Sequence, residues 1–149
     1  MLWIDYGNLT GDETDGHIDT LVRIAPDYTL LYIGCDDETD EQYADLKTME
    51  DQLKTFRTLS GEPYKLVKLP MPRAIFDEDG LRLPATYANF LVINGAVLVP
   101  TYNQPDLDAE AMRLIGETFP GRDIVGIDCR SIIKQHGSLH CCTMQYPEI

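Results

Sequence analysis

A pattern of predicted strand, strand, helix and strand occurs twice in succession along this chain of 149 residues, and it restricts the fold more than any other feature. In each unit, two short apolar runs flank a turn signal, a helix with an acidic start follows, and a third apolar run ends the unit. The predicted strands cover residues 21–24, 29–34 and 64–69, and then 90–93, 96–99 and 123–127. The offset is roughly 65 residues, and tandem units of this kind pack around a shared axis because one unit alone cannot bury its apolar faces. The expected fold class is α/β.

The turns between the paired strands have their own sequence signals. Pro26-Asp27 predicts a turn in the first unit. Asn94-Gly95 in the second unit is typical of a type I′ hairpin, in which both central residues take a positive φ. The opening residues 1–4 are also expected to be β-rich.

Both predicted helices begin in acidic segments and end at a glycine. The first is expected to follow residues 36–40 and to end at Ser60-Gly61, because apolar residues recur at three- and four-residue steps up to that point. These residues are Tyr43, Leu46, Met49, Leu53, Phe56 and Leu59. The second helix is expected to begin at Pro105 and to end at Pro120-Gly121.

The acidic composition limits the partners that the chain can bind. It has 25 Asp and Glu residues against 12 Lys and Arg, a formal net charge of −13, and 44% hydrophobic residues. This hydrophobic content is typical of a globular protein with a packed core. An acidic surface repels phosphate groups, so neither nucleic acid nor an anionic membrane is an expected partner. The charge permits a cationic ligand, although most acidic side chains of soluble proteins simply face solvent.

We expect a cytoplasmic protein. The first six residues include no basic region, and the longest apolar run, residues 90–100, is interrupted by Asn94-Gly95 and too short to span a bilayer. The chain has four cysteines, too few for a disulfide scaffold, and in a reducing compartment they would be thiols. They are Cys35, Cys129, Cys141 and Cys142.

Two short segments at opposite ends of the chain hold the residues suited to chemistry. Residues 15–19 read Asp-Gly-His-Ile-Asp; an extended backbone would place His17 and Asp19 on the same side, whereas a helical turn would separate them. Residues 137–143 read Gly-Ser-Leu-His-Cys-Cys-Thr, a glycine-led approach to a thiol. A Cys and a distant His form a nucleophile and base only if the fold brings them together. A thiol with a pKa of about 8.5 also needs a nearby cation or positive dipole to ionise at neutral pH.

Each of these residues has an alternative role. His17 could be a hydrogen-bonded structural residue. His136 lies four residues before His140, so the two could share a helix face and, with Cys141, form a zinc site. The chain has no Cys-x-x-Cys pair, and it has no glycine-rich phosphate loop, no Gly-x-Ser-x-Gly motif and no dinucleotide fingerprint. We therefore expect neither a metal nor a cofactor.

Three sequence blocks, in this order, resemble the agmatine deiminases of the bacterial, Porphyromonas-type peptidylarginine deiminase family. The blocks are Gly11-Asp12-Glu13-Thr14-Asp15-Gly16-His17-Ile18-Asp19, Tyr87-Ala88-Asn89-Phe90 continuing through Asn94-Gly95 to Thr101, and Gly137 to Gln145. The resemblance covers essentially the whole chain. It implies the pentein fold, an α/β propeller of five ββαβ units around a pseudo-fivefold axis, of which this chain would hold two to three.

The resemblance also implies roles for individual residues. Cys141 is similar to the nucleophile that attacks a guanidinium carbon, His17 to the general acid and base, and Asp19 to a carboxylate that binds the guanidinium nitrogens. Of the other acidic residues, we expect only Asp15 as a second substrate-binding candidate. The implied reaction converts agmatine to N-carbamoylputrescine and ammonia through an amidino-cysteine intermediate. It needs no metal or cofactor, and the implied partner is a small cationic guanidinium compound.

The chain also departs from the family pattern. Family members are more than twice as long, and their first half supplies a second guanidinium-binding Asp in an Arg-Asp motif and a Glu in a Glu-Gly-Gly motif. Neither is found here, so we expect residues 1–149 to be the C-terminal portion of a deiminase domain, and to associate with a missing N-terminal half or with another copy. Two alternatives remain open: a catalytically inactive binding or assembly module of the same fold, and a peptidylarginine deiminase that acts on arginine residues.

Overall fold

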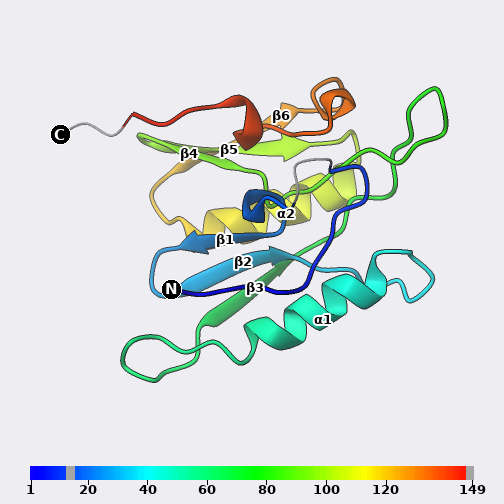
Figure 1. Cartoon of the computed structure of the whole chain (residues 1–149). Helices are drawn as coiled ribbons and strands as arrows, with labels where there is room; N and C mark the ends of the chain where they lie inside the picture. The colour runs from blue at the N-terminus through cyan, green and yellow to red at the C-terminus, as the bar shows by residue number, and fades with distance from the viewer. Residues whose placement is uncertain (13–15, 147–149) are drawn as a thin grey trace.

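The computed structural model describes residues 1–12 and 16–146, and it confirms the tandem arrangement (Figure 1). The first unit comprises β1 (Val22–Ala25), β2 (Thr29–Ile33), α1 (Tyr43–Leu53) and β3 (Lys65–Leu69). The second comprises β4 (Leu91–Ile93), β5 (Ala96–Thr101), α2 (Pro105–Thr118) and β6 (Asp123–Asp128). Three short 3₁₀ turns complete the description: η1 (Ile18–Thr20), η2 (Ile133–Gln135) and η3 (His140–Cys142). The predicted α/β class is confirmed.

The two sheets have identical topology. In the first, β2 lies in the middle, antiparallel to β1 and parallel to β3. In the second, β5 lies in the middle, antiparallel to β4 and parallel to β6. Each helix therefore forms part of the crossover that joins two parallel strands, as a ββαβ unit requires.

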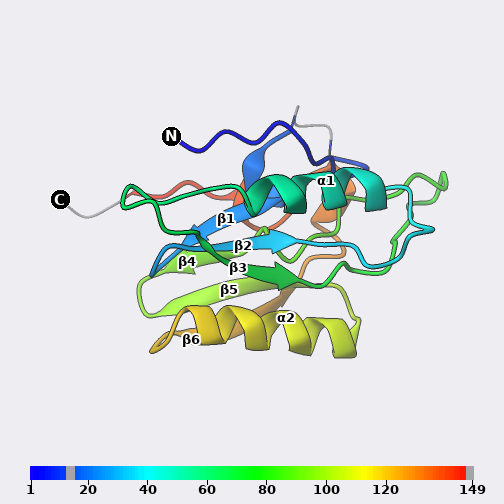
Figure 2. The same cartoon turned by 90° about the horizontal axis from the view of Figure 1, so that it is seen from below.

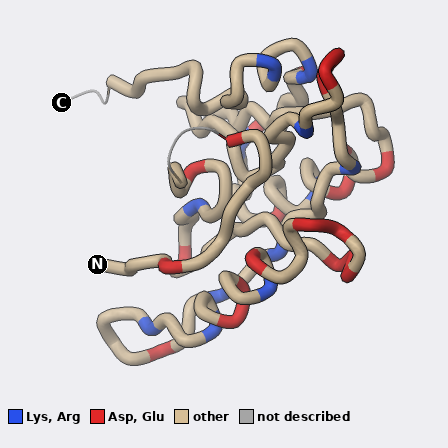
Figure 3. Tube along the Cα trace, turned by 45° about the vertical axis from the view of Figure 1, so that its right-hand side comes forward, with Lys and Arg blue, Asp and Glu red and all other residues tan. Residues whose placement is uncertain are grey.

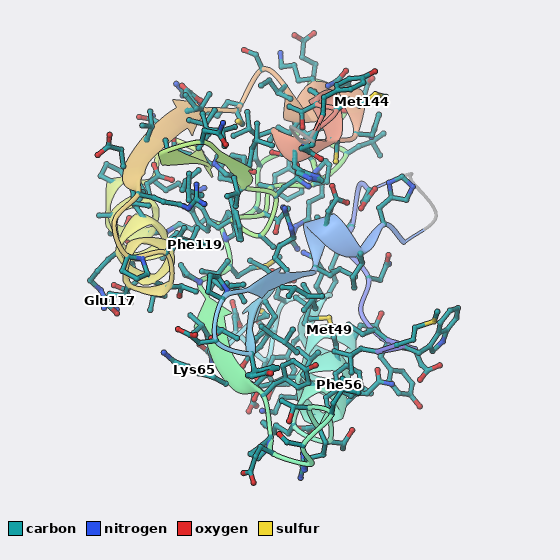
Figure 4. All side chains as sticks on the ribbon, turned by 90° about the vertical axis from the view of Figure 1, so that its left-hand side faces the viewer. Met49, Phe56, Lys65, Glu117, Phe119 and Met144 are labelled. Atoms are coloured by element: carbon teal, nitrogen blue, oxygen red, sulfur yellow. The ribbon has the colours of Figure 1, made fainter. Side chains whose placement is uncertain are left out.

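Two hydrophobic cores meet at β2, which is buried along its whole length. Successive side chains of a strand point to opposite faces of the sheet. Leu30 and Tyr32 accordingly belong to the first core, together with Met49 of α1, whereas Leu31 belongs to the second, together with Phe119 at the end of α2. Figure 1 shows α2 between the two sheets and α1 on the outer side of the first sheet, and Figure 2 shows the same elements from below. Figure 4 shows Met49 and Phe119 in separate parts of the molecule.

The first helix is shorter than its apolar periodicity predicted. It ends at Leu53, and Leu59, at the end of the predicted stripe, is fully exposed. Residues 57–63 instead form a tight turn, in which Arg57 bridges Pro63 and Gly61 takes a φ of 87°. Gly61 therefore marks this turn rather than the end of the helix, whereas α2 ends at Thr118, close to the predicted stop.

Two further details differ from expectation. Residues 1–4 form no strand and pair with no neighbouring strand. They lie along α1, where Gln52 Nε2 donates to the Trp3 carbonyl and Gln52 Oε1 accepts the backbone N–H of Asp5. The predicted hairpin at Asn94-Gly95 is present, but only Gly95 takes a positive φ (79°), so its turn is not type I′. The turn predicted at Pro26-Asp27 is confirmed.

A buried linker, residues 83–90, passes between the two units and is held from several directions. Just before it, Arg82 forms a bidentate ion pair with Asp40, with both N···O distances at 2.9 Å. Within it, Thr86 Oγ1 donates to the carbonyl of Thr20 (2.8 Å), and Arg23 donates to the carbonyls of Ala88 (3.1 Å) and Phe90 (2.6 Å). The linker is thereby fixed against η1, which contains Thr20, and against β1, which contains Arg23.

The acidic residues gather mainly outside the cores. Figure 3 shows a run of acidic residues in the loop between β2 and α1, which corresponds to residues 36–41. Among the described residues, no helix is both long enough and apolar enough to cross a membrane.

Candidate active site

The fold brings together two side chains that lie 122 residues apart in the sequence. Asp19 lies in η1, before the first strand, and Cys141 lies in η3, after the last one. The Cys141 thiol donates to Asp19 Oδ2 over 3.5 Å. The carboxylate and the thiol of the two predicted segments are therefore immediate neighbours.

The helical turn η1 decides how the Asp-Gly-His-Ile-Asp segment presents its side chains. Thr20 fixes this turn, because its hydroxyl contacts both Asp12 Oδ2 (2.8 Å) and the His17 carbonyl (2.9 Å). His17 caps the turn and is exposed, whereas the Asp19 side chain is only 17% exposed. Within the described residues, no hydrogen bond joins the His17 ring to Asp19 or Cys141. Of the two geometries open to this motif, the structure has the one that separates His17 from Asp19.

The glycine before the thiol has a steric reason. A Cβ atom at Gly137 would lie 3.2 Å from the Cβ of Cys141 and 3.7 Å from its sulfur. The next residue, Ser138, is fully buried, and its hydroxyl hydrogen-bonds the phenol of Tyr102 (3.0 Å). The approach to Cys141 is therefore both close-packed and anchored to the second core.

One oxygen of the Asp19 carboxylate receives all of its side-chain hydrogen bonds. His140 Nδ1 lies 2.6 Å from Oδ2, and Asn89 Nδ2 donates to the same oxygen over 3.0 Å. Burial alone would raise the pKa of Asp19, but the hydrogen bonds from His140 and Asn89 outweigh it and lower the pKa below its usual value. Within the described residues no donor contacts Oδ1. Asp19 is therefore an ionised carboxylate whose side-chain hydrogen bonds within the described residues all fall on Oδ2.

Asn89, at 0% exposure, joins the two halves of the site. Its amide oxygen accepts the backbone N–H groups of His140 (2.8 Å) and Cys141 (3.2 Å). Its amide nitrogen contacts the Asp19 carbonyl (3.1 Å) and the Cys141 sulfur (3.4 Å) in addition to Oδ2. The amide thus contacts both the thiol and the carboxylate.

The Cys141 thiol is not ionised by its surroundings. The residue as a whole is exposed, yet burial of the sulfur among its neighbours is the main reason that its pKa is raised, and the Asp19 charge raises it further. Arg23 interacts electrostatically with Asp19 and Cys141, and its own pKa is lowered because burial outweighs the attraction of these two groups. A positively charged ligand beside Asp19 would lower the pKa of Cys141.

The reactivity of Cys141 should follow this raised pKa. In a Cys142→Ala background, which removes the other exposed thiol, we expect the rate of iodoacetamide alkylation to keep rising with pH above the ordinary cysteine midpoint of about 8.5. The measurement is alkylation rate against pH, with the modified peptide identified by mass. Cys35 and Cys129 are buried and should remain unmodified in the folded protein. A midpoint below 8 would contradict the electrostatics described here.

The residues of the zinc alternative do not converge. His136 ends η2 with a φ of 66°, and its Nδ1 lies 3.1 Å from the carbonyl oxygen of Gly11, while His140 contacts Asp19. Cys142 lies beside Gln135, whose Nε2 is 2.8 Å from its sulfur. Among the described residues, no three His, Cys, Asp or Glu side chains are grouped so that they could hold a metal ion. The structure therefore gives the zinc alternative no support.

A groove of about 770 Å³ opens beside the site. Its charged or titratable lining residues are Asp19, Arg23 and His140. The rest of its wall is mainly apolar, with side chains from the N-terminal segment, η1 and the first sheet: Leu2, Trp3, Ile4, Ile18, Val22, Ile24, Leu30 and Phe56. The groove therefore combines one acidic and one basic side chain, Asp19 and Arg23, with a wall that is otherwise mainly apolar.

Of the four site residues expected from the sequence, the structure brings Asp19 and Cys141 together and leaves His17 apart. Asp15 lies outside the described residues. Sequence reasoning did not assign Asn89 to the site, nor the contact between His140 and Asp19. The available signal for Asn89 was one amide inside an otherwise apolar run, because a polar side chain is retained in a core only where it is hydrogen-bonded.

Comparison with known proteins places this geometry in a family. The family model for Porphyromonas-type peptidyl-arginine deiminase matches residues 1–147. Agmatine deiminases from Medicago truncatula and Stutzerimonas stutzeri are 30% and 31% identical to the chain, over 100% and 99% of its length. The match covers only 45% and 44% of those proteins, so the chain spans less than half the length of these relatives.

Solved structures give the same result. A candidate arginine deiminase from Porphyromonas gingivalis is 57% identical, with a TM-score of 0.92 over 96% of this chain and 42% of its own. A C. jejuni agmatine deiminase with substrate bound is 39% identical, with a TM-score of 0.84 over 93% of this chain and 39% of its own. The fold is therefore of the pentein type, represented here by two ββαβ units. The chain belongs to the Porphyromonas-type peptidyl-arginine deiminase family.

Proposed function

We propose that this chain supplies the nucleophile and a substrate-binding carboxylate of a guanidine iminohydrolase whose substrate is agmatine. One observation carries the proposal: Asp19 presents an ionised carboxylate 3.5 Å from the Cys141 thiol and lines the adjacent groove. The names of the relatives support it, because agmatine deiminases match nearly the whole chain.

The geometry suits attack on a guanidinium carbon. A guanidinium N–H would donate to Asp19 Oδ1, which would hold the planar cation beside the sulfur through a charge-assisted hydrogen bond. The cation would lower the raised pKa of Cys141 and favour the thiolate. The sulfur then bonds to the guanidinium carbon, and the tetrahedral adduct expels ammonia once the leaving nitrogen is protonated. Water hydrolyses the amidino-cysteine, giving a ureido product, N-carbamoylputrescine from agmatine, and regenerating the thiol.

His17 is the proposed general acid and base. An imidazole can both donate a proton to the leaving nitrogen and accept one from the attacking water. Its ring has no hydrogen-bond partner among the described residues, so turning it toward a bound substrate breaks no such bond. We propose Asp15, the other acidic residue of the Asp-Gly-His-Ile-Asp segment, as a second substrate-binding carboxylate. The reaction as written uses no metal and no organic cofactor.

We further propose that the apolar wall of the groove is covered in the whole protein, meaning this chain together with any segment encoded next to it. Trp3 and Ile24 line this wall and are 71% and 77% exposed. Exposed apolar side chains gathered in one patch are typical of a surface that another segment or subunit covers. The covering group would be the remaining half of a deiminase domain or a second copy of the chain, within a cytoplasmic protein that binds no nucleic acid.

Peptidyl-arginine deiminase is the second candidate. The names of the matching family model and of the similar P. gingivalis structure support this candidate, in which arginine is the source of the guanidinium group. Asp19 and Cys141 act on the group that these substrates share, so their geometry is compatible with both. The third candidate function is that of a catalytically inactive module that still binds a guanidinium cation.

Ammonia release separates these functions. The whole protein should be incubated in turn with agmatine, free arginine and an arginine-containing peptide, and both ammonia and the ureido product measured. We expect turnover of agmatine. Turnover of the peptide alone would support the second candidate, and calorimetric binding of agmatine without ammonia release would support the inactive module.

A further inference from the structure

We infer that Tyr102 is a positioning residue whose buried phenol fixes residues 137–139 beside the Cys141 sulfur. The inference rests on the proposed function, because it concerns how the nucleophile of that reaction is held. It adds a residue at the end of β5 that acts through Ser138 rather than on the substrate.

The phenol of Tyr102 joins the segment before Cys141 to the linker 83–90. A phenol has one O–H donor, so every further bond that it makes must be one that it accepts. It donates to the Thr86 carbonyl (2.9 Å) and accepts the Thr86 N–H (3.0 Å). The Ser138 hydroxyl, 3.0 Å away, is therefore the donor in its own bond to the phenol. One oxygen thus holds two segments of the site together.

The phenol itself is held by the second core. Tyr102 directly follows β5 and is 2% exposed, and both Thr86 and Ser138 are fully buried. The Tyr102 backbone N–H donates to Asp108 Oδ1 in α2 (3.0 Å), and its ring packs edge-on against Tyr87 with the centroids 5.5 Å apart. A buried polar group that loses its partner leaves an unpaired donor or acceptor, which is costly. The three-way contact is therefore fixed in place.

Ser138 transmits this constraint to the nucleophile. Its neighbour Gly137 lies so close that a Cβ atom there would be 3.7 Å from the Cys141 sulfur. Burial raises the pKa of Cys141, and the largest opposing influence is a hydrogen bond from the Ser138 backbone. Ser138 is thus anchored to Tyr102 by its hydroxyl while its backbone supports the thiolate. A displaced Ser138 would weaken that support and leave the contacts of Asp19 intact.

Tyr102→Phe removes the hydroxyl and keeps the ring, and two reagents of similar size measure its effect on Cys141 in the Cys142→Ala background. Chloroacetamide is neutral and reports the thiolate alone, whereas chloroacetamidine carries a cation that Asp19 can bind and should react faster. In Tyr102→Phe both rates at pH 7 should fall about tenfold, the effect of one weakened hydrogen bond to a charged group. The ratio of the two rates should stay at the parent value, because the hydrogen bonds of Asp19 are unchanged.

The pH dependence of alkylation should move with these rates. A tenfold loss of thiolate at pH 7 corresponds to a rise of about one pH unit in the alkylation midpoint. The charged or titratable groups around Cys141 are Asp19, Arg23 and His140, and Tyr102→Phe alters none of them. An unchanged midpoint in Tyr102→Phe would overturn the inference.

Ser138→Ala removes the other half of the same hydrogen bond and tests whether the two residues act through it. It also keeps the inference testable if Tyr102→Phe folds poorly, because Ser138→Ala leaves the phenol bound to Thr86. Each single variant should slow chloroacetamide, and the double variant should be no slower than the more affected single one. Losses that multiply would show that the two residues act independently, which contradicts the inference.

Tyr87→Phe is the matched control. Tyr87 is fully buried and belongs to the same ring pair, but its hydroxyl donates to Asp108 (2.7 Å) rather than to Ser138. Both alkylation rates should stay within about twofold of the parent, as for a change that touches no reacting group. An equal fall in Tyr87→Phe would show that the effect belongs to packing of the second core, and the positioning role would be wrong.

Steady-state kinetics of the whole protein separate a placed thiol from a weakened substrate site. In Tyr102→Phe we expect kcat for agmatine to fall and KM to stay within about twofold, because the phenol supports Cys141 and not Asp19. A raised KM with an unchanged kcat would contradict the inference.

The remaining outcomes distinguish this inference from the proposed function. If the parent releases ammonia and Tyr102→Phe is alkylated at the parent rate, the positioning role is wrong and the proposed function stands. If the parent shows no preference for chloroacetamidine and releases no ammonia from any guanidinium substrate, the proposed function fails. A slowed chloroacetamide reaction in Tyr102→Phe would then still support the placement of the thiol by the phenol.

Discussion

Ammonia release from agmatine is expected to fall by about 10⁴-fold or more when Cys141 is replaced by alanine in the whole protein. The reaction needs a covalent bond to the guanidinium carbon, and Cys141 is the thiol in contact with the proposed binding carboxylate. Alanine leaves the backbone N–H of residue 141 to donate to Asn89, so the fold of η3 should persist. The measurement is the initial rate of ammonia production at saturating agmatine.

The neighbouring thiol provides the control. Cys142 is also exposed, but its sulfur lies beside Gln135. Cys142→Ala should therefore retain ammonia release within about twofold, in the range of an exposed side chain that contacts no reacting group. If Cys142→Ala lost ammonia release and Cys141→Ala retained it, the nucleophile would be Cys142 rather than Cys141.

The second large effect is expected from Asp19→Asn, which removes the charge and keeps the shape. The loss of one partner from a hydrogen-bonded charge pair costs about 2–5 kcal/mol, so kcat/KM for agmatine should fall about 30-fold to several thousand-fold. Chloroacetamidine should also lose its advantage over chloroacetamide in this variant, because the amidinium has no carboxylate to bind. The measurements are steady-state kinetics and the alkylation-rate ratio at Cys141.

Asp128→Asn is the control for charge. Asp128 is exposed and pairs with Arg130 at the end of β6, so its replacement changes the net charge equally without touching the site. Its kcat/KM should match that of the parent. A full retention of activity in Asp19→Asn would contradict the assignment of Asp19 as the guanidinium-binding group.

Much of the fold was predictable because it depends on local patterns. Paired apolar runs around Pro26-Asp27 and Asn94-Gly95 located β1, β2, β4 and β5, and acidic starts located both helices. The errors arose where a local pattern had no tertiary partner. Leu59 continues the apolar spacing of α1 but meets no core, and residues 1–4 have strand-like composition but no strand to pair with.

The candidate site was predictable only in part. The glycine-led Cys141 and the His17–Asp19 motif were evident as short segments, and the family resemblance gave them roles. No spacing in the sequence indicates that Asn89 contacts both segments, because their meeting depends on how the linker 83–90 packs between the two units.

The sequence by itself determined the repeated ββαβ order, the two chemically active segments and the family resemblance, since these follow from periodicity, turn residues and motifs that are local in the chain. Only the tertiary structure decided that Asp19 contacts Cys141, that His17 stands apart, and that one buried amide joins the nucleophile to the carboxylate. The physical reason is that Asn89 and Cys141 are separated by 52 positions in the sequence, and Asp19 and Cys141 by 122. Hydrogen bonds over such separations form only after both units have packed their cores.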